Sequence, residues 1–365
     1  MKTRFPTFIA SAALLILCIC CTENEPPAPT GNGDTTIILD TTSHDFIWDI
    51  TQIGVRHTLL LDIEAISDTD VWICGEIHFE DTNRYDSLGN FIKPFNLGHW
   101  NGREWSFMRL KWSPHIPLDF NRIRSIKAFS RDDIWFHAGR KIAHLKNGSY
   151  RFWELPYEKG GTYLMEGTPD DLYFAGGNGR LMHFDGTEFR MMNSGTDKDI
   201  QDMWTVGRTV LCVADNWSEH SNNETLVLKL EKGGVTRWRD TAMYKGMCGI
   251  WAPDMRNIFF AGPEVLQYNP DHIGLFRSKT GWITHNLPFN GFLMKIRGTA
   301  LNDIFVGGHF GAIQHFNGWT WSYYPEAAPY EREYVLNQMC YIPNHVYFVG
   351  FDKAGVAHVI HGRRR

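Results

Sequence analysis

Histidine, the side chain best suited to acid–base or metal chemistry near neutral pH, recurs at one place in a repeated pattern of this chain. Three of the five recurring histidines are followed by an aromatic residue and then Asn-Gly or Asp-Gly. The five are His99, His144, His183, His315 and His358. A metal site needs its ligands within about 2 Å of one ion, but residues that recur once per repeat are spread around a closed array of repeats. The pattern therefore predicts structural histidines that join neighbouring strands within each repeat.

Charged and aromatic side chains also gather in two segments that interrupt the repeat, residues 76–97 and 216–224. Packing of the repeats does not require such insertions, and long loops often carry function. Together with the loops between successive repeats, they supply the candidate ligand-binding residues Trp112, Tyr157, Trp217, Tyr244, Tyr330, Arg332, Glu76 and Glu80. We expect replacement of Trp112, Trp217 and Tyr330 with Ala to abolish ligand binding and to leave thermal stability nearly unchanged.

The catalytic signals in the sequence are weak. It contains no Gly-x-Ser-x-Gly, His-Glu-x-x-His, phosphate-loop or dinucleotide-binding motif, and we expect no cofactor and no metal. Glu80 and Asp81 lack the ligand spacing of a dedicated calcium loop. Carboxylates for acid–base work on a glycan can be chosen among Glu76, Glu80, Asp81 and Glu219, but no spacing selects one pair. A glycan hydrolase or lyase therefore stays an alternative to a binding module.

The elements that must position these residues come from a phrase that occurs seven times. It has a small polar residue, an aliphatic residue, usually an aromatic, two more residues, and then Gly or Ala. The phrases start at Asp70, Asp133, Asp171, Thr209, Asn257, Asp303 and His345. Most successive starts are about 40 to 50 residues apart, the period of a propeller blade. The sequence therefore predicts an all-β, seven-bladed β-propeller.

Each repeat reads as four antiparallel strands. Repeat six shows them at 292–299, 303–308, 312–316 and 320–324, with the turn Asn317-Gly318 between the last two. Asn-Gly favours a tight hairpin because both residues accept positive φ. Repeat seven supplies strands at 336–342, 346–351 and 356–360 but no fourth strand. We predict that 46–50, which resembles the fourth strands of other repeats, completes that blade and leaves no open sheet edge at the seam.

These motifs resemble those of bacterial seven-bladed propellers with Asp-hydrophobic-Trp and Asn-Gly-x-x-Trp repeats, similar in layout to kelch and WD40 rings. The resemblance covers nearly all of the chain from Phe46 onward. It implies a fold and no particular chemistry.

The first 21 residues resemble a bacterial lipoprotein signal peptide. Lys2 and Arg4 precede an apolar segment, 8–17, that is too short to span a bilayer, and Cys18, Cys20 and Cys21 follow. The resemblance implies lipidation at Cys21, with Cys20 as the alternative; an ordinary secretory signal is the other interpretation. Residues 22–43 are rich in Pro, Gly and Thr, as expected of a tether, and 44–365 form the propeller. The start of the tether also resembles the acidic surface-export signal of lipoproteins in the Bacteroidota.

The composition of the chain limits the classes of partner that we expect. The formal net charge of −5 is spread without a basic stripe, which argues against nucleic acid. Cys74, Cys212, Cys248 and Cys340 fall in different repeats without paired spacing, so we expect buried strand thiols. We expect a monomeric lipoprotein of the bacterial outer membrane whose propeller binds or scaffolds an unidentified protein or glycan; the membrane leaflet is left open, and the export-like signal favours exposure at the cell surface. A purely structural envelope protein is the third alternative.

Overall fold

Seven strands of the computed structural model begin at the seven residues that open the repeated phrase. They are β3 (Asp70–Ile77), β9 (Asp133–Ala138), β13 (Asp171–Gly176), β17 (Thr209–Ala214), β21 (Asn257–Ala261), β25 (Asp303–Gly308) and β29 (His345–Phe351). The structure describes residues 40–112, 120–155, 161–216, 225–238, 246–270, 281–329 and 332–365. These belong to one compact unit, Leu39–Arg365.

Each of the seven strands is the second strand of a four-stranded antiparallel sheet. The inner strands are β2 (Leu59–Ser67), β8 (Ser125–Ser130), β12 (Thr162–Thr168), β16 (Ile200–Val206), β20 (Gly249–Asp254), β24 (Leu293–Ala300) and β28 (Val335–Ile342). The third strands are β6 (Phe95–Trp100), β10 (Lys141–Lys146), β14 (Leu181–Phe184), β18 (Leu226–Glu231), β22 (Val265–Tyr268), β26 (Gln314–Phe316) and β30 (Ala357–Arg364). The outer strands are β7 (Trp105–Met108), β11 (Ser149–Glu154), β15 (Phe189–Met192), β19 (Gly234–Arg237), β23 (Trp282–His285), β27 (Trp321–Tyr323) and β1 (Phe46–Gln52).

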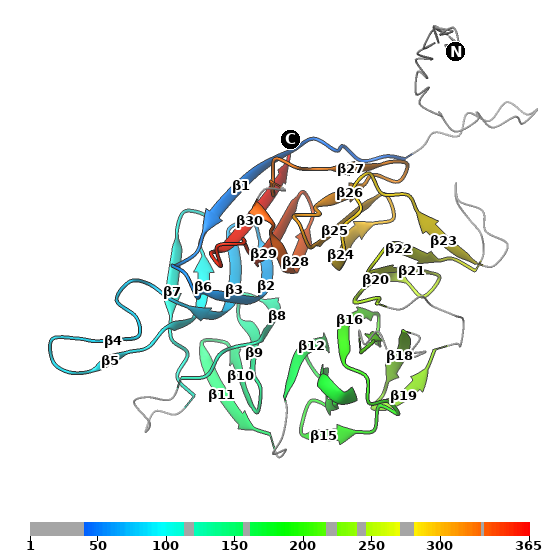
Figure 1. Ribbon diagram of the computed structural model, residues 1–365. Helices are drawn as coiled ribbons and strands as arrows, with labels where there is room; N and C mark the ends of the chain where they lie inside the picture. The colour runs from blue at the N-terminus through cyan, green and yellow to red at the C-terminus, as the bar shows by residue number, and fades with distance from the viewer. Residues whose placement is uncertain are drawn as a thin grey trace, which may run out of the picture. The chain divides into compact units, whose positions relative to one another are not determined.

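The predicted seven-bladed propeller is therefore confirmed. Figure 1 shows the inner strands around the centre of the ring. Two short strands, β4 (Arg84–Tyr85) and β5 (Phe91–Ile92), form a separate hairpin, and a 3₁₀ turn, η1, covers Gly177–Gly179. Among the described residues, no helix is long and apolar enough to cross a membrane.

The ring closes as predicted, by pairing of its first strand with its last. β1 pairs with β30 along its whole length, from Phe46 opposite Arg364 to Gln52 opposite His358, and the two strands lie side by side in Figure 1. Trp48 thus lies on the outermost strand of the seventh blade. β30 extends to Arg364, beyond the predicted end at residue 360, because it has a hydrogen-bonding partner on both sides.

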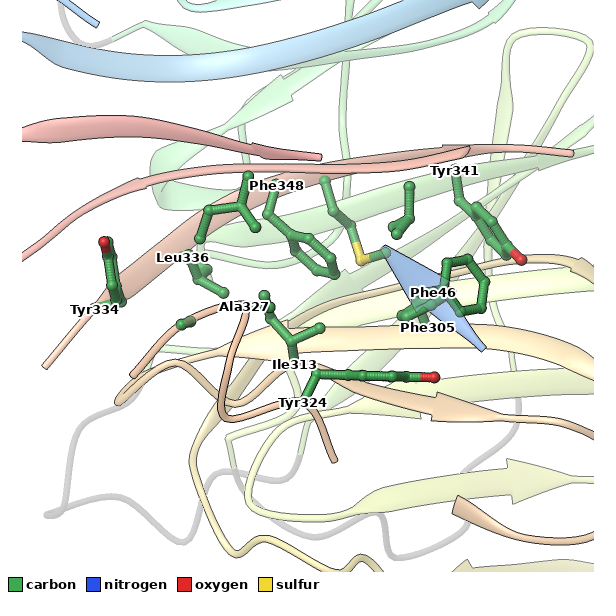
Figure 2. Packing of buried hydrophobic residues seen from close by; sticks show 13 residues of the cluster. Phe46, Phe305, Ile313, Tyr324, Ala327, Tyr334, Leu336, Tyr341 and Phe348 are labelled. Carbon is green, nitrogen blue, oxygen red and sulfur yellow. The ribbon is translucent and has the colours of Figure 1, made fainter. Parts of the chain in front are cut away.

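The seam between blades 6 and 7 is filled by an apolar cluster that Figure 2 shows from close by. Phe46 of β1 is 7% exposed, and its ring centroid lies 5.0 Å from that of Phe305 in a T-shaped contact. Tyr324 of blade 6 lies 6.0 Å away, between centroids, on another side of the Phe46 ring. The first strand of the propeller therefore contributes core packing as well as backbone hydrogen bonds.

The repeated phrase ends in Gly or Ala for a steric reason. In five inner strands one extra residue forms a β-bulge near the start of the strand, directly before Asp62, Leu164, Asp202, Lys295 and Gln338. The chain at the start of the inner strand lies very close to the end of the phrase, so that a Cβ on Gly308 would lie 2.1 Å from the carbonyl oxygen of Phe292. A bulge also re-aims the side chains that follow it.

The two faces of the ring differ. The turns that join first to second and third to fourth strands lie on one face, here called the turn face, and all other connections lie on the opposite face, the loop face. The chain enters at the turn face, where Thr42 donates its backbone N–H to Asn317 O (3.2 Å) and its hydroxyl to Asn302 O (2.5 Å). Contacts of the propeller thus begin before His44, the predicted start of the domain.

Candidate functional site

The repeated histidines have structural contacts of the predicted kind. In four blades the histidine Nε2 lies within hydrogen-bond distance of the Asp that opens the phrase, for example 2.7 Å for His144 and Asp133 and 2.9 Å for His315 and Asp303. The same ring stacks on the aromatic residue of the phrase, with centroids 3.9 Å apart for His144 and Trp135. These contacts join the second and third strands of these four blades.

Blade 7 corrects one assignment in this series. His358 lies opposite Gly350, whereas His361 lies opposite Tyr347 and stacks on it at 4.3 Å between centroids. His361 is therefore the equivalent residue of blade 7. His345 replaces the usual Asp, and its Nδ1 lies 3.0 Å from His361 Nε2.

On the loop face, the insertion of blade 1 is held by a polar cluster at its base. Glu76 accepts hydrogen bonds from Arg122, with Nε at 2.7 Å, and its other oxygen lies 3.1 Å from His78 Nε2. His78 is buried, and its Nδ1 lies 3.0 Å from the side-chain nitrogen of Asn83. Glu76, which the sequence suggested as a ligand contact, thus helps to hold the base of the insertion through its contacts with Arg122 and His78.

Beyond this base, β4 and β5 form a hairpin whose turn is fixed by Asp86. The Asp86 carboxylate accepts the backbone N–H groups of Leu88 and Asn90, both at 2.8 Å. Three large apolar side chains are exposed near the tip: Leu88 at 84%, Tyr85 at 73% and Phe91 at 36%. The hairpin points outward from the ring in Figure 1. An ordered, projecting element with apolar side chains is suited to contact another molecule.

The other candidate residues are not brought together by the described structure. Trp112 is 7% exposed and packs in the apolar cluster between blades 1 and 2, a core position where the sequence suggested an exposed loop. Glu80 is exposed on the insertion, and Arg332 is exposed and donates to the hydroxyl of Tyr334 at 3.2 Å. Tyr157, Trp217, Glu219, Tyr244, Tyr330 and the proposed lipidation site Cys21 lie outside the described residues.

A second site, not anticipated from the sequence, lies on the axis of the ring. A cavity of about 190 Å³ is lined by inner strands of six blades. The acidic and basic side chains that line it are Asp62, Glu64, Lys127, Glu166, Asp202 and Arg297. Blade 5 contributes none of these side chains. Lys295 and Arg297 of blade 6 reach past it to Asp202 of blade 4, and a nitrogen of each lies 2.8 Å from a carboxylate oxygen of Asp202.

Most charges on the axis are paired. Lys127 Nζ lies 3.1 Å from Glu166 and 3.9 Å from Glu64. Burial disfavours the charge of Lys127, but these two carboxylates outweigh it and raise the pKa of the ammonium group. Burial similarly opposes ionisation of Asp202, yet Arg297 and Lys295 keep the pKa of its carboxyl below the usual value. The ion pairs therefore link blades 1, 2 and 3 in one group and blades 4 and 6 in another, and Thr205 of blade 4 joins the two groups by donating its hydroxyl to Glu166 at 2.8 Å.

Asp62 differs from the other three acids. Its carboxylate accepts the backbone N–H groups of Ile63 and Ile126, both at 2.9 Å. Within the described part of the chain, no Lys or Arg nitrogen lies within 4.0 Å of it. Burial, together with the charge of Glu64, raises the pKa of Asp62 to about 7.

The sequence did carry a signal for this site. The inner strands of four blades start with an apolar residue followed two positions later by a polar one, as in Leu60-x-Asp62, Ile200-x-Asp202, Leu293-x-Lys295 and Leu336-x-Gln338. Charged residues in otherwise apolar inner strands must face the axis, because both broad faces of each blade pack on neighbouring blades.

Comparisons with known proteins show the fold alone. No family model matches the chain, and no curated protein matches it. Among solved structures, it is similar to "YCF48 bound to D1 peptide" (TM-score 0.60, 12% identity, 87% of this chain and 97% of that chain). It is also similar to the "WD40 beta propeller domain of Doa1" (0.56, 9%, 86% and 96%) and to "BBS1N in complex with ARL6DN" (0.53, 13%, 88% and 96%).

Proposed function

We propose that this protein is a lipid-anchored component of a bacterial cell envelope whose propeller binds a protein partner through its loop face. The observation that carries the proposal is the projecting hairpin, which exposes Tyr85, Leu88 and Phe91 on a turn fixed by Asp86. Large aromatic and aliphatic side chains supply most of the affinity in protein interfaces. Two solved propellers of similar fold are described by their names as bound to a peptide and to another protein.

The sequence ahead of the propeller supports the anchoring part of the proposal. The signal-like segment, residues 1–21, is followed by the tether, and Asp40 near the end of the tether accepts a hydrogen bond from Asn302 at the turn face through its carbonyl oxygen. A lipid on Cys21 would anchor the propeller to a membrane through this tether. Metabolic labelling with a palmitate analogue tests this: Cys21→Ala should abolish incorporation, and retained labelling would contradict lipidation at that residue.

Site-specific photo-crosslinking in cells tests the binding surface. A photoreactive residue at Leu88 should give a discrete protein adduct, and the same residue at Leu301, which is 44% exposed on the turn face, serves as the matched control. Combined replacement of Tyr85 and Phe91 with Ser should remove the adduct without lowering the melting temperature. Equal adducts at both positions, or an adduct that survives the double replacement, would contradict a hairpin-centred interface.

A further inference from the structure

The axial cavity has the size and lining of a small-molecule site. Its volume of about 190 Å³ exceeds that of an engineered cavity of about 150 Å³ that binds benzene. It therefore has room for a compound of roughly six to eight non-hydrogen atoms. Ile63, Met165 and Met339 add apolar surface to the polar lining, so the cavity offers both kinds of contact that small ligands use.

When Asp62 is ionised, the cavity has one negative charge without a paired cation. Four carboxylates, Asp62, Glu64, Glu166 and Asp202, meet three cations, Lys127, Lys295 and Arg297, and all three cations are engaged by Glu64, Glu166 and Asp202. Asp62 is left with its two backbone donors. A partly buried carboxylate that has no cation beside it is costly to keep ionised unless a positive group approaches it.

Gln338 provides a second polar group in the same part of the cavity. Asp62 and Gln338 each follow the bulge of their inner strand, in adjacent blades 1 and 7, and both line the cavity. Among the described residues, the Gln338 side chain has no hydrogen-bond partner, and it is only partly buried, as is Asp62. A carboxylate and an amide oxygen are therefore available at one level of the channel.

We propose that the axial cavity binds a small organic cation, a primary ammonium compound with a short apolar tail, whose charged group contacts Asp62 and Gln338. An ammonium group donates three hydrogen bonds, which suits these two acceptors, and the tail would lie along Met339 and Ile63. An organic anion would be repelled by the excess negative charge of the cavity. Within the described chain, no group of three His, Cys, Asp or Glu side chains is arranged to hold a metal ion.

The test uses three probes of equal chain length, butylammonium, butan-1-ol and butanoate, in titration calorimetry with the unmodified protein at pH 8. Butylammonium should bind at least about ten-fold more tightly than butan-1-ol, because a hydrogen bond to a charged group is worth more than a neutral one. Butanoate should not bind. Absence of butylammonium binding at millimolar concentration, as for a channel that holds only water, would overturn the proposal, and so would equal binding of all three probes.

Two variants locate the site. Asp62→Asn should abolish the preference for butylammonium over butan-1-ol, and Asp68→Asn, the same change at an exposed turn of the same blade, should retain it. Gln338→Leu should weaken butylammonium binding several-fold, which gives an independent reading should Asp62→Asn fold poorly. Butylammonium binding unaffected by a folded Asp62→Asn or Gln338→Leu protein would place the ligand elsewhere.

Discussion

The strand that closes the propeller, β1, should stabilise the fold through the buried aromatic side chain of Phe46, and Phe46→Ala measures that contribution. The Phe46 ring packs on Phe305 and Tyr324, and the guanidinium of Arg364 lies 5.0 Å from its centroid. Truncation of a buried Phe to Ala costs about 3–5 kcal/mol. Since β1 is an outer strand that can shift into part of the space, we expect about 3 kcal/mol, near the lower end.

Phe91→Ala provides the matched control, because it is the same substitution at a residue that is 36% exposed on the projecting hairpin. It should cost about 1 kcal/mol or less, because the Phe91 ring packs on Tyr85 in a hairpin separate from the seven sheets, and its loss leaves no cavity in the core. Urea unfolding, followed by tryptophan fluorescence and by far-UV circular dichroism, gives both free energies of unfolding. A loss for Phe46→Ala within the error of that for Phe91→Ala would refute the view that the seam depends on β1 packing.

Four further results are expected. Burial, together with the charges of His315 and Arg364, lowers the pKa of His44 from 6.5 to about 4, so the unfolded chain binds more protons than the folded protein between these pH values. The free energy of unfolding should therefore fall as the pH decreases from about 7 to 4. Unfolding at several pH values should show a weaker dependence of this free energy on pH for His44→Gln. Asp202→Asn leaves Lys295 and Arg297 buried without their carboxylate and should cost about 3–5 kcal/mol in denaturant unfolding, and a loss under about 1 kcal/mol would contradict the pairing. Trp112→Ala should lower the melting temperature clearly, because the ring is buried, and an unchanged melting temperature would restore the loop assignment. Asp86→Ala should speed amide hydrogen exchange at Leu88 and Asn90 with little change in global stability, and unchanged exchange would show that the turn does not depend on this carboxylate.

Much of the fold could be predicted because each blade repeats the same local constraints. The start of the second strand is marked by an Asp that pairs with a histidine, and its end by a Gly that the close approach of the inner strand requires, as at Asp303 and Gly308. Both signals are short-range and recur in the sequence. The closing strand could be inferred because the last repeat is one strand short.

The candidate site was less accessible to sequence analysis, for two physical reasons. The axial network joins residues of different blades, such as Asp202 and Lys295, whose proximity exists only once the ring has closed. The exposure of a loop residue depends on neighbouring blades, so Trp112 looked like a surface residue although its ring fills a gap beside Phe152. Irregular insertions carry no repeat signal, and strands as short as β4 and β5 leave no periodicity.

The pairing of β1 with β30 has a consequence for biogenesis. The segment that finishes the ring emerges first during synthesis, whereas its partner, Ala357–Arg364, emerges last. Six sheets can form progressively while Phe46–Gln52 has no partner strand. The pairing of β1 with β30 then joins segments that are almost the whole length of the polypeptide apart. Such distant pairing is slow, so the propeller keeps an unpaired sheet edge, prone to aggregation, until β30 has formed and paired with β1.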